Sequence, residues 1–239
     1  MKRLALASFA FAFACGGSKP PAEAPTEDHE TKPAHHAGSG HKRGPSVSQE
    51  LGEIDPQEAN RAFQRIQGKL MACQKDGMRK VEPLAGDIKV FVRIGADGHA
   101  RYAYFEESTL GDVETEKCML DVIGRASWPQ PRGGEAETRT SFSFESGDAR
   151  EPSPWGPDKV QSALSKVDGD LKKCTSGLTG TVKVTAYVEP DGKEGKVLAV
   201  GVATQNKEAA AKVECIADAV KGMKLPSPGS YLAKVTFQL

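Results

Sequence analysis

The sequence predicts an α+β fold made of two tandem copies of one small unit. Residues 59–145 and 160–239 align through four shared features. These are an apolar stripe leading into a cysteine, an alternating stretch ending in Asp-Gly, a second cysteine followed eleven residues later by proline, and a closing strand containing phenylalanine. A repeat of this length is one folding unit used twice, and its patterns run helix, strand, strand, helix, strand.

A helix is predicted at the start of each copy. In the first copy it runs from Pro56 to about Lys75, with Asp55 as N-cap. The residues expected on the inward faces of the two helices are Ala59, Phe63, Ile66, Leu70 and Cys73 in the first copy, and Val160, Leu164, Val167, Leu171 and Cys174 in the second.

A three-stranded antiparallel sheet is predicted in each copy. Residues 86–98 and 180–192 alternate between apolar and polar side chains, as in a strand with one buried face, and the Asp-Gly pairs favour a hairpin turn. Second strands follow, and then a second helix at about 111–126 or 207–223. Because a helical crossover makes strand three parallel to strand two, the expected sheet order is 2-1-3, with both helices on one face.

The domain plan that follows has five parts. They are a signal peptide at 1–14, a lipidated cysteine and disordered tether at 15–54, a first domain at 55–146, a linker at 147–156 and a divergent second domain at 157–239.

Composition excludes several classes of function. Lys+Arg and Asp+Glu both total 32, and the two signs are interleaved, so no basic stripe for nucleic acid is present. The folded region has a single histidine, His99, in a predicted hairpin turn, and the sequence contains no hydrolase, phosphate-loop or C-x-x-C motif. We therefore expect no enzyme, no catalytic residue, no cofactor and no metal ligand in the folded region.

The first residues resemble an export signal. Lys2 and Arg3 precede an apolar segment, Leu4 to Ala14, which Cys15 follows directly. Two processing routes are open: cleavage by ordinary signal peptidase, or lipidation of Cys15 after a lipoprotein-type box. Lipidation would anchor the protein in a membrane facing the periplasm, and we expect the outer membrane rather than the inner.

Five cysteines in an exported chain predict disulfides with one cysteine left over. Four cysteines allow three pairings, and domains that fold independently favour Cys73–Cys118 with Cys174–Cys215. This pairing leaves Cys15 for the lipid. The alternative is four reduced, buried cysteines.

The predicted tether contains the other histidines, His29, His35, His36 and His41. Imidazole suits zinc, copper or nickel, but a disordered segment supplies no outer groups to orient its ligands. A periplasmic ligand or metal carrier that uses this tether is therefore the alternative function.

The first copy resembles a known family. The run from Ser108 through Leu110-Gly111-Asp112 to Cys118, followed by Trp128-Pro129 and the Phe142-x-Phe144 strand, resembles the AgmX/PglI C-terminal domain of myxobacteria. Members of that family are similar to the C-terminal domain of TonB, and some are linked to gliding motility. The second copy departs from the pattern, with residues 207–209 (Lys-Glu-Ala) aligned to Leu-Gly-Asp.

The resemblance implies a non-enzymatic cell-envelope protein with a binding or scaffolding role. In a 2-1-3 sheet the third strand lies at an edge, where a partner's extended segment can add as a further strand. We therefore expect envelope proteins as partners, and residues 231–239 as one exposed edge.

Overall fold

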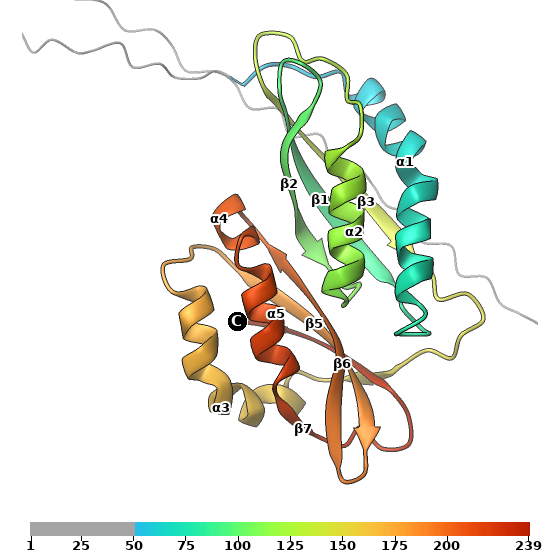
Figure 1. Ribbon diagram of the computed structural model, residues 1–239, viewed down its shortest axis with the longest axis vertical. Helices are drawn as coiled ribbons and strands as arrows, with labels where there is room; N and C mark the ends of the chain where they lie inside the picture. Colours follow the sequence, from blue (N-terminus) through green and yellow to red (C-terminus); the bar gives the residue numbers. More distant parts are fainter. Residues whose placement is uncertain (1–50) are drawn as a thin grey trace, which may run out of the picture. The chain divides into compact units, whose positions relative to one another are not determined.

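The computed structural model describes residues 51–239, and each copy contains the predicted succession of elements (Figure 1). The elements of the first copy are α1 (Pro56–Gly77), β1 (Gly86–Ile94), β2 (Ala100–Ser108), α2 (Val113–Gly124) and β3 (Ala136–Phe144). Those that follow are β4 (Ser153–Trp155), α3 (Asp158–Thr175), β5 (Val182–Asp191), β6 (Glu194–Thr204), α4 (Lys207–Ala210), α5 (Val213–Lys221), β7 (Lys224–Pro226) and β8 (Ala233–Gln238).

The first copy confirms the predicted sheet. Its strands are antiparallel in the order β2-β1-β3, and α1 and α2 lie together over one face (Figure 1). Asp55 caps α1 as expected, because its carboxylate accepts from the N–H groups of Gln57 and Glu58. The stripe on α1 is buried against the sheet, so helix and strand periods agree on one core.

The second copy keeps the α+β class but corrects the strand count from three to five. The order β6-β5-β8 repeats the 2-1-3 plan, and two short strands extend it to β4-β8-β5-β6-β7. Ser153–Trp155, predicted as linker, pairs parallel to β8, and Lys224–Pro226 pairs with β6. Edge strands offer unpaired N–H and C=O groups, which these extended segments satisfy.

Two helix predictions for the second copy are partly wrong. The helix predicted at 207–223 is divided into α4 and α5, although no proline or glycine separates them. On α3, Val160, Leu171 and Cys174 are buried as expected, whereas Leu164 and Val167 are only half-buried.

Both predicted disulfides are present. Cys73–Cys118 joins α1 to α2 with Cα atoms 5.8 Å apart, and Cys174–Cys215 joins α3 to α5 with Cα atoms 5.7 Å apart. Disulfides indicate an oxidising, non-cytoplasmic compartment. Cys15, the predicted signal peptide and the histidines of the predicted tether lie outside the described residues. None of the helices described between residues 51 and 239 has the length and apolar character needed to cross a bilayer.

Candidate functional site

The Leu110-Gly111-Asp112 motif of the first copy lies at the junction with the second copy. Leu110 is fully buried in the first core. Gly111 adopts a positive φ of 86°, and a Cβ at this position would lie 2.9 Å from the Tyr187 ring and 3.0 Å from the Thr185 methyl group. Both of those side chains come from β5 of the second copy. The motif therefore fits against the second sheet only because residue 111 has no side chain.

A second glycine, Gly201 of β6, lies against the backbone of Gly111. Gly201 lies opposite Thr185 in the β5–β6 pair. A Cβ at Gly201 would lie 2.8 Å from the backbone nitrogen and Cα of Gly111 and would also collide with the Glu116 carboxylate. Glycine inside a strand often marks a close backbone approach. Here two glycines, one from each copy, let the two backbones meet.

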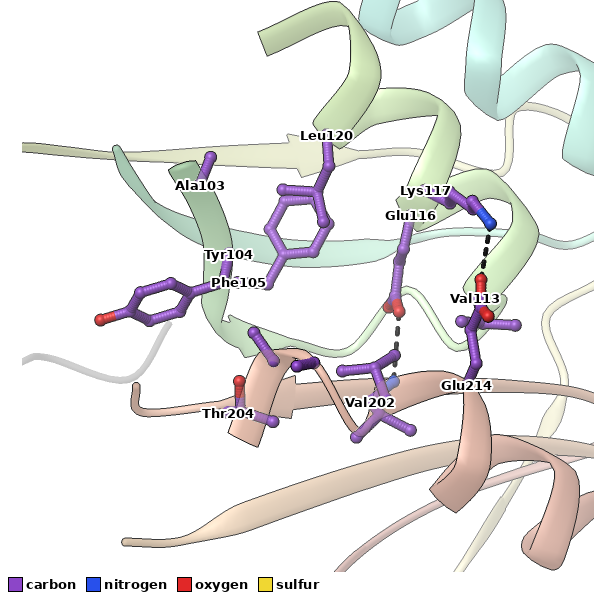
Figure 2. Close-up of a pocket in the computed structure, with 13 residues that line it drawn as sticks. Ala103, Tyr104, Phe105, Val113, Glu116, Lys117, Leu120, Val202, Thr204 and Glu214 are labelled. Atoms are coloured by element: carbon purple, nitrogen blue, oxygen red, sulfur yellow. Dashed lines mark hydrogen bonds and ion pairs between the residues drawn. The ribbon is translucent and has the colours of Figure 1, made fainter. Parts of the chain in front are cut away.

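Glu116 is a buried acid that joins the two copies. It projects from α2 toward β6, where its carboxylate accepts from the Val202 N–H at 3.1 Å (Figure 2). The same carboxylate accepts from the Ser108 hydroxyl at 2.5 Å. Burial raises the pKa of Glu116 to about 7, and the nearby Asp112 adds to the increase. The carboxyl thus satisfies an edge N–H of the second sheet from within the first copy.

Two further side chains, the buried Tyr187 and the half-buried Lys234, connect the copies near residues 83–85. The Tyr187 hydroxyl is 3.2 Å from the Ala85 carbonyl oxygen, to which it donates, and it accepts from the Ala85 N–H at 3.3 Å. The Lys234 ammonium donates to the same carbonyl at 2.6 Å and lies 5.2 Å from the centre of the Tyr187 ring. Burial lowers the pKa of Lys234 to about 8.

The two copies have diverged in complementary ways. Opposite residues Thr185 and Gly201 of the second sheet correspond to Phe91 and Tyr104 of the first, which stack with ring centres 4.8 Å apart. Large aromatic rings therefore fill the face in the first copy that small residues leave open in the second. The first copy carries the inserting Leu-Gly-Asp segment, and only the second has the open face that receives it.

The structure also corrects the alignment of the motif in the second copy. Asp112 is the N-cap of α2 and accepts from the Thr115 N–H at 3.1 Å. The matching N-cap is Asn206, which caps α4 through the Ala209 N–H at 2.8 Å. The structural counterparts of Leu110 and Gly111 are thus Thr204 and Gln205, and the second copy keeps the cap without the insertion.

A cavity of about 310 Å³ opens beside this junction (Figure 2). Phe105, Leu120 and Val202 contribute apolar walls. At one side an ion pair joins Lys117 of α2 to Glu214 of α5 at 2.5 Å. The cavity is a gap in the interface between α2 and the α4–α5 segment.

The outer edge of β3 is the second notable feature. Asp87 exchanges hydrogen bonds with Thr109, so its backbone faces β2. In an antiparallel ladder, neighbouring residues face opposite sides, so Gly86 and Ile88 face β3. Since they pair with Phe144 and Phe142 in an unbroken register, the alternate β3 residues direct their N–H and C=O groups outward. These outward residues, Glu137, Arg139, Ser141 and Ser143, are called the β3 edge below.

The β3 edge lacks the protection that the second sheet has. Among residues 51–239 no strand pairs with it. The second sheet is flanked by three-residue strands that contain Pro154 and Pro226, and Glu116 covers a further edge N–H. Short edge strands and prolines are the usual protection against unwanted pairing. Arg139 does not protect the β3 edge, because its guanidinium lies 4.6 Å from the centre of the Phe91 ring on the sheet face and pairs with Glu106.

The prediction of an exposed edge at residues 231–239 is corrected in part. β4 pairs with Ala233–Val235, so half of the six-residue β8 strand is already covered on that side. Residues 147–156 were predicted as a linker because the strand within them, β4, has only three residues, too few to show the alternation of a strand.

Of the predicted site residues, the four disulfide cysteines pair as expected, and His99 lies in the turn between β1 and β2, bridged to Ser127. Within residues 51–239 no group of three or more His, Cys, Asp or Glu side chains is placed to hold a metal ion. Sequence reasoning missed Glu116 and Lys234, whose burial has no local pattern. Gly201 carried a usable signal, since it interrupts an otherwise regular strand.

Comparisons of this chain with protein-family models, with curated proteins and with solved structures returned no match.

Proposed function

We propose that this protein is a non-enzymatic lipoprotein of the cell envelope whose first copy binds an extended segment of another envelope protein along the β3 edge. A lipid on Cys15 anchors it, with the outer membrane as the site, and the disulfides support the oxidising compartment that this requires. We also propose that the two copies are related to the AgmX/PglI C-terminal domain and to the C-terminal domain of TonB. The protein would then act as part of an envelope or gliding-motility complex.

One observation carries the proposal: within residues 51–239, β3 is a nine-residue strand whose outer edge has no partner, whereas the outermost strands of the second sheet, β4 and β7, have three residues each. An edge of this length offers main-chain hydrogen bonds to an added strand, while side chains on the sheet face can select the sequence. β2, at the opposite side of the first sheet, packs beside β6 of the second copy. The β3 edge is therefore the side of the first sheet that remains free to receive a partner.

Ser141→Pro should abolish partner binding without unfolding the sheet. Ser141 is exposed, and its N–H belongs to the β3 edge, so proline removes an outward donor and leaves the β1–β3 ladder intact. The measurement is capture from an envelope extract by immobilised wild-type and variant chains. We expect the proline variant to capture at most about one tenth of the amount of partner that wild type captures.

Ser141→Thr is the matched control, because it keeps the N–H and favours a strand. It should capture the partner like wild type, and circular dichroism should show that both variants fold. Equal capture by Ser141→Pro and Ser141→Thr would exclude the β3 edge as the binding site. Sedimentation of the purified chain distinguishes a second copy as the occupant, since self-pairing would make a dimer that Ser141→Pro dissociates.

A further inference from the structure

Two ionisable groups of opposite sign, the buried Glu116 and the half-buried Lys234, connect the two copies, and neither forms a salt bridge within the described residues. Glu116 of the first copy binds the Val202 N–H of the second, and Lys234 of the second binds the Ala85 carbonyl of the first. Glu116 is taken out of water and Lys234 partly so, each with hydrogen bonds but without a counter-ion in contact. Docking of the copies must therefore depend on the protonation of both groups.

Among residues 51–239, no cation forms an ion pair with Glu116. Asp112 is the charged group that acts on it, and it does so unfavourably. The ammonium of Lys80 is bound to Asp112 at 3.0 Å, and the ammonium of Lys117 is bound to Glu214. The strand that Glu116 contacts offers only the Val202 N–H, so protonation is the route by which this carboxyl loses its charge.

The charge that acts on Lys234 is opposite in sign to its own, whereas the charge that acts on Glu116 has the same sign as its own. Asp87 is the charged group that acts on the ammonium, and it favours the charged form. Glu145 and Glu151 line the cavity of about 480 Å³ beside Lys234, but the hydrogen-bond partner of the ammonium is the Ala85 carbonyl oxygen. Burial against Ala85 and the Tyr187 ring outweighs the effect of Asp87, so the pKa of Lys234 lies below its ordinary value.

We propose that the junction is a pH-sensitive clamp, in which the two copies dock least strongly near neutral pH and more strongly in both acid and alkali. The protonation states of Glu116 and Lys234 would then determine how strongly the two copies dock. Opening would return the Val202 N–H to an unpaired edge and expose the face of β5 that Gly111 covers.

The direction follows from linkage for each group. The pKa of Glu116 is about 7 when docked against an ordinary 4.5, so the docked form binds more protons between these values, and docking weakens as pH rises through them. The pKa of Lys234 is about 8 when docked against an ordinary 10.5, so the docked form binds fewer protons in that range, and docking strengthens as pH rises. The minimum lies between pH 7 and 8.

Urea unfolding of the full chain from pH 5 to 9.5 tests the clamp. Wild type should have its lowest midpoint between pH 7 and 8, and the docking constant should fall by roughly fiftyfold between pH 5 and pH 7.5, since each pKa unit is a factor of ten. Glu116→Gln should flatten the acid side alone, and Lys234→Met the alkaline side alone. Asp121→Asn, at an exposed acid on the same helix, and Lys196→Met, at an exposed lysine of the second copy, are the matched controls and should follow wild type, because the ion pairs of both residues stay within one copy.

A second measurement keeps the test decisive if a variant fails to fold. In the wild-type chain, the carboxyl carbon of Glu116 and the Val202 amide should titrate together in an NMR series, with an apparent pKa well above 4.5. A wild-type midpoint that does not change from pH 5 to 9.5 would overturn the proposal. So would a Glu116 carboxyl that titrates near 4.5, or variants whose profiles parallel wild type.

Discussion

Replacing Cys73 and Cys118 together by alanine should lower the free energy of unfolding by about 4 kcal/mol. The disulfide closes a segment with a sequence separation of 45, and the loss of loop entropy in the unfolded chain gives about this value for that length. Small domains have total stabilities of about 5–15 kcal/mol, so the loss is a large fraction of what the first copy can have. Urea denaturation monitored by circular dichroism measures it.

The second disulfide provides an internal comparison. Cys174 and Cys215 have a sequence separation of 41, so Cys174→Ala with Cys215→Ala should cost nearly the same. A loss below about 1 kcal/mol for either pair would show that the bridges contribute little, and that helix and sheet packing alone stabilise the copies.

Gly111→Ala should be strongly destabilising, with a loss of about 2–5 kcal/mol in the free energy of unfolding. The positive φ disfavours any residue with a Cβ by about 1–2 kcal/mol, and forcing a methyl group against packed side chains costs about 1–3 kcal/mol more. The methyl group would press on Tyr187 and Thr185, so the change should separate the copies as well as destabilise the chain. Urea denaturation gives the first effect, and exchange of the Val202 amide gives the second.

Gly177→Ala is the matched control. Gly177 has a φ of 78°, close to that of Gly111, but nothing lies within 4 Å of the added Cβ. It should therefore show the backbone cost of about 1–2 kcal/mol and leave the junction closed. Equal losses at the two positions would mean that the contact between Gly111 and β5 contributes no stability of its own.

The sequence predicted the fold of each copy well because its signals are local and repeated. Residues only a few positions apart determine each of these signals, namely the apolar stripe of α1, the Asp55 cap and the alternating strands. The disulfide pairing followed from the duplication itself. β4 was missed because three residues with a central proline show no alternation, and their pairing depends on a distant strand.

The junction could not be predicted from the sequence, because it depends on residues far apart that meet only in the folded chain. Glu116 lies on a helix among other acids, and no local pattern separates it from the exposed Glu114. The difference between the copies at Leu-Gly-Asp was visible, and the structure gives its physical reason: only one copy inserts the segment, and only the other has room to receive it.

Amide hydrogen exchange of the whole chain, measured residue by residue with and without the captured partner, tests the account most directly. In the free chain, the Val202 N–H should exchange slowly because Glu116 binds it, and the N–H groups of Arg139, Ser141 and Ser143 should exchange quickly. Addition of the partner should slow exchange at these three and leave Val202 unchanged. Rapid exchange at Val202 in the free chain, or protection by the partner that spares the β3 edge, would contradict it.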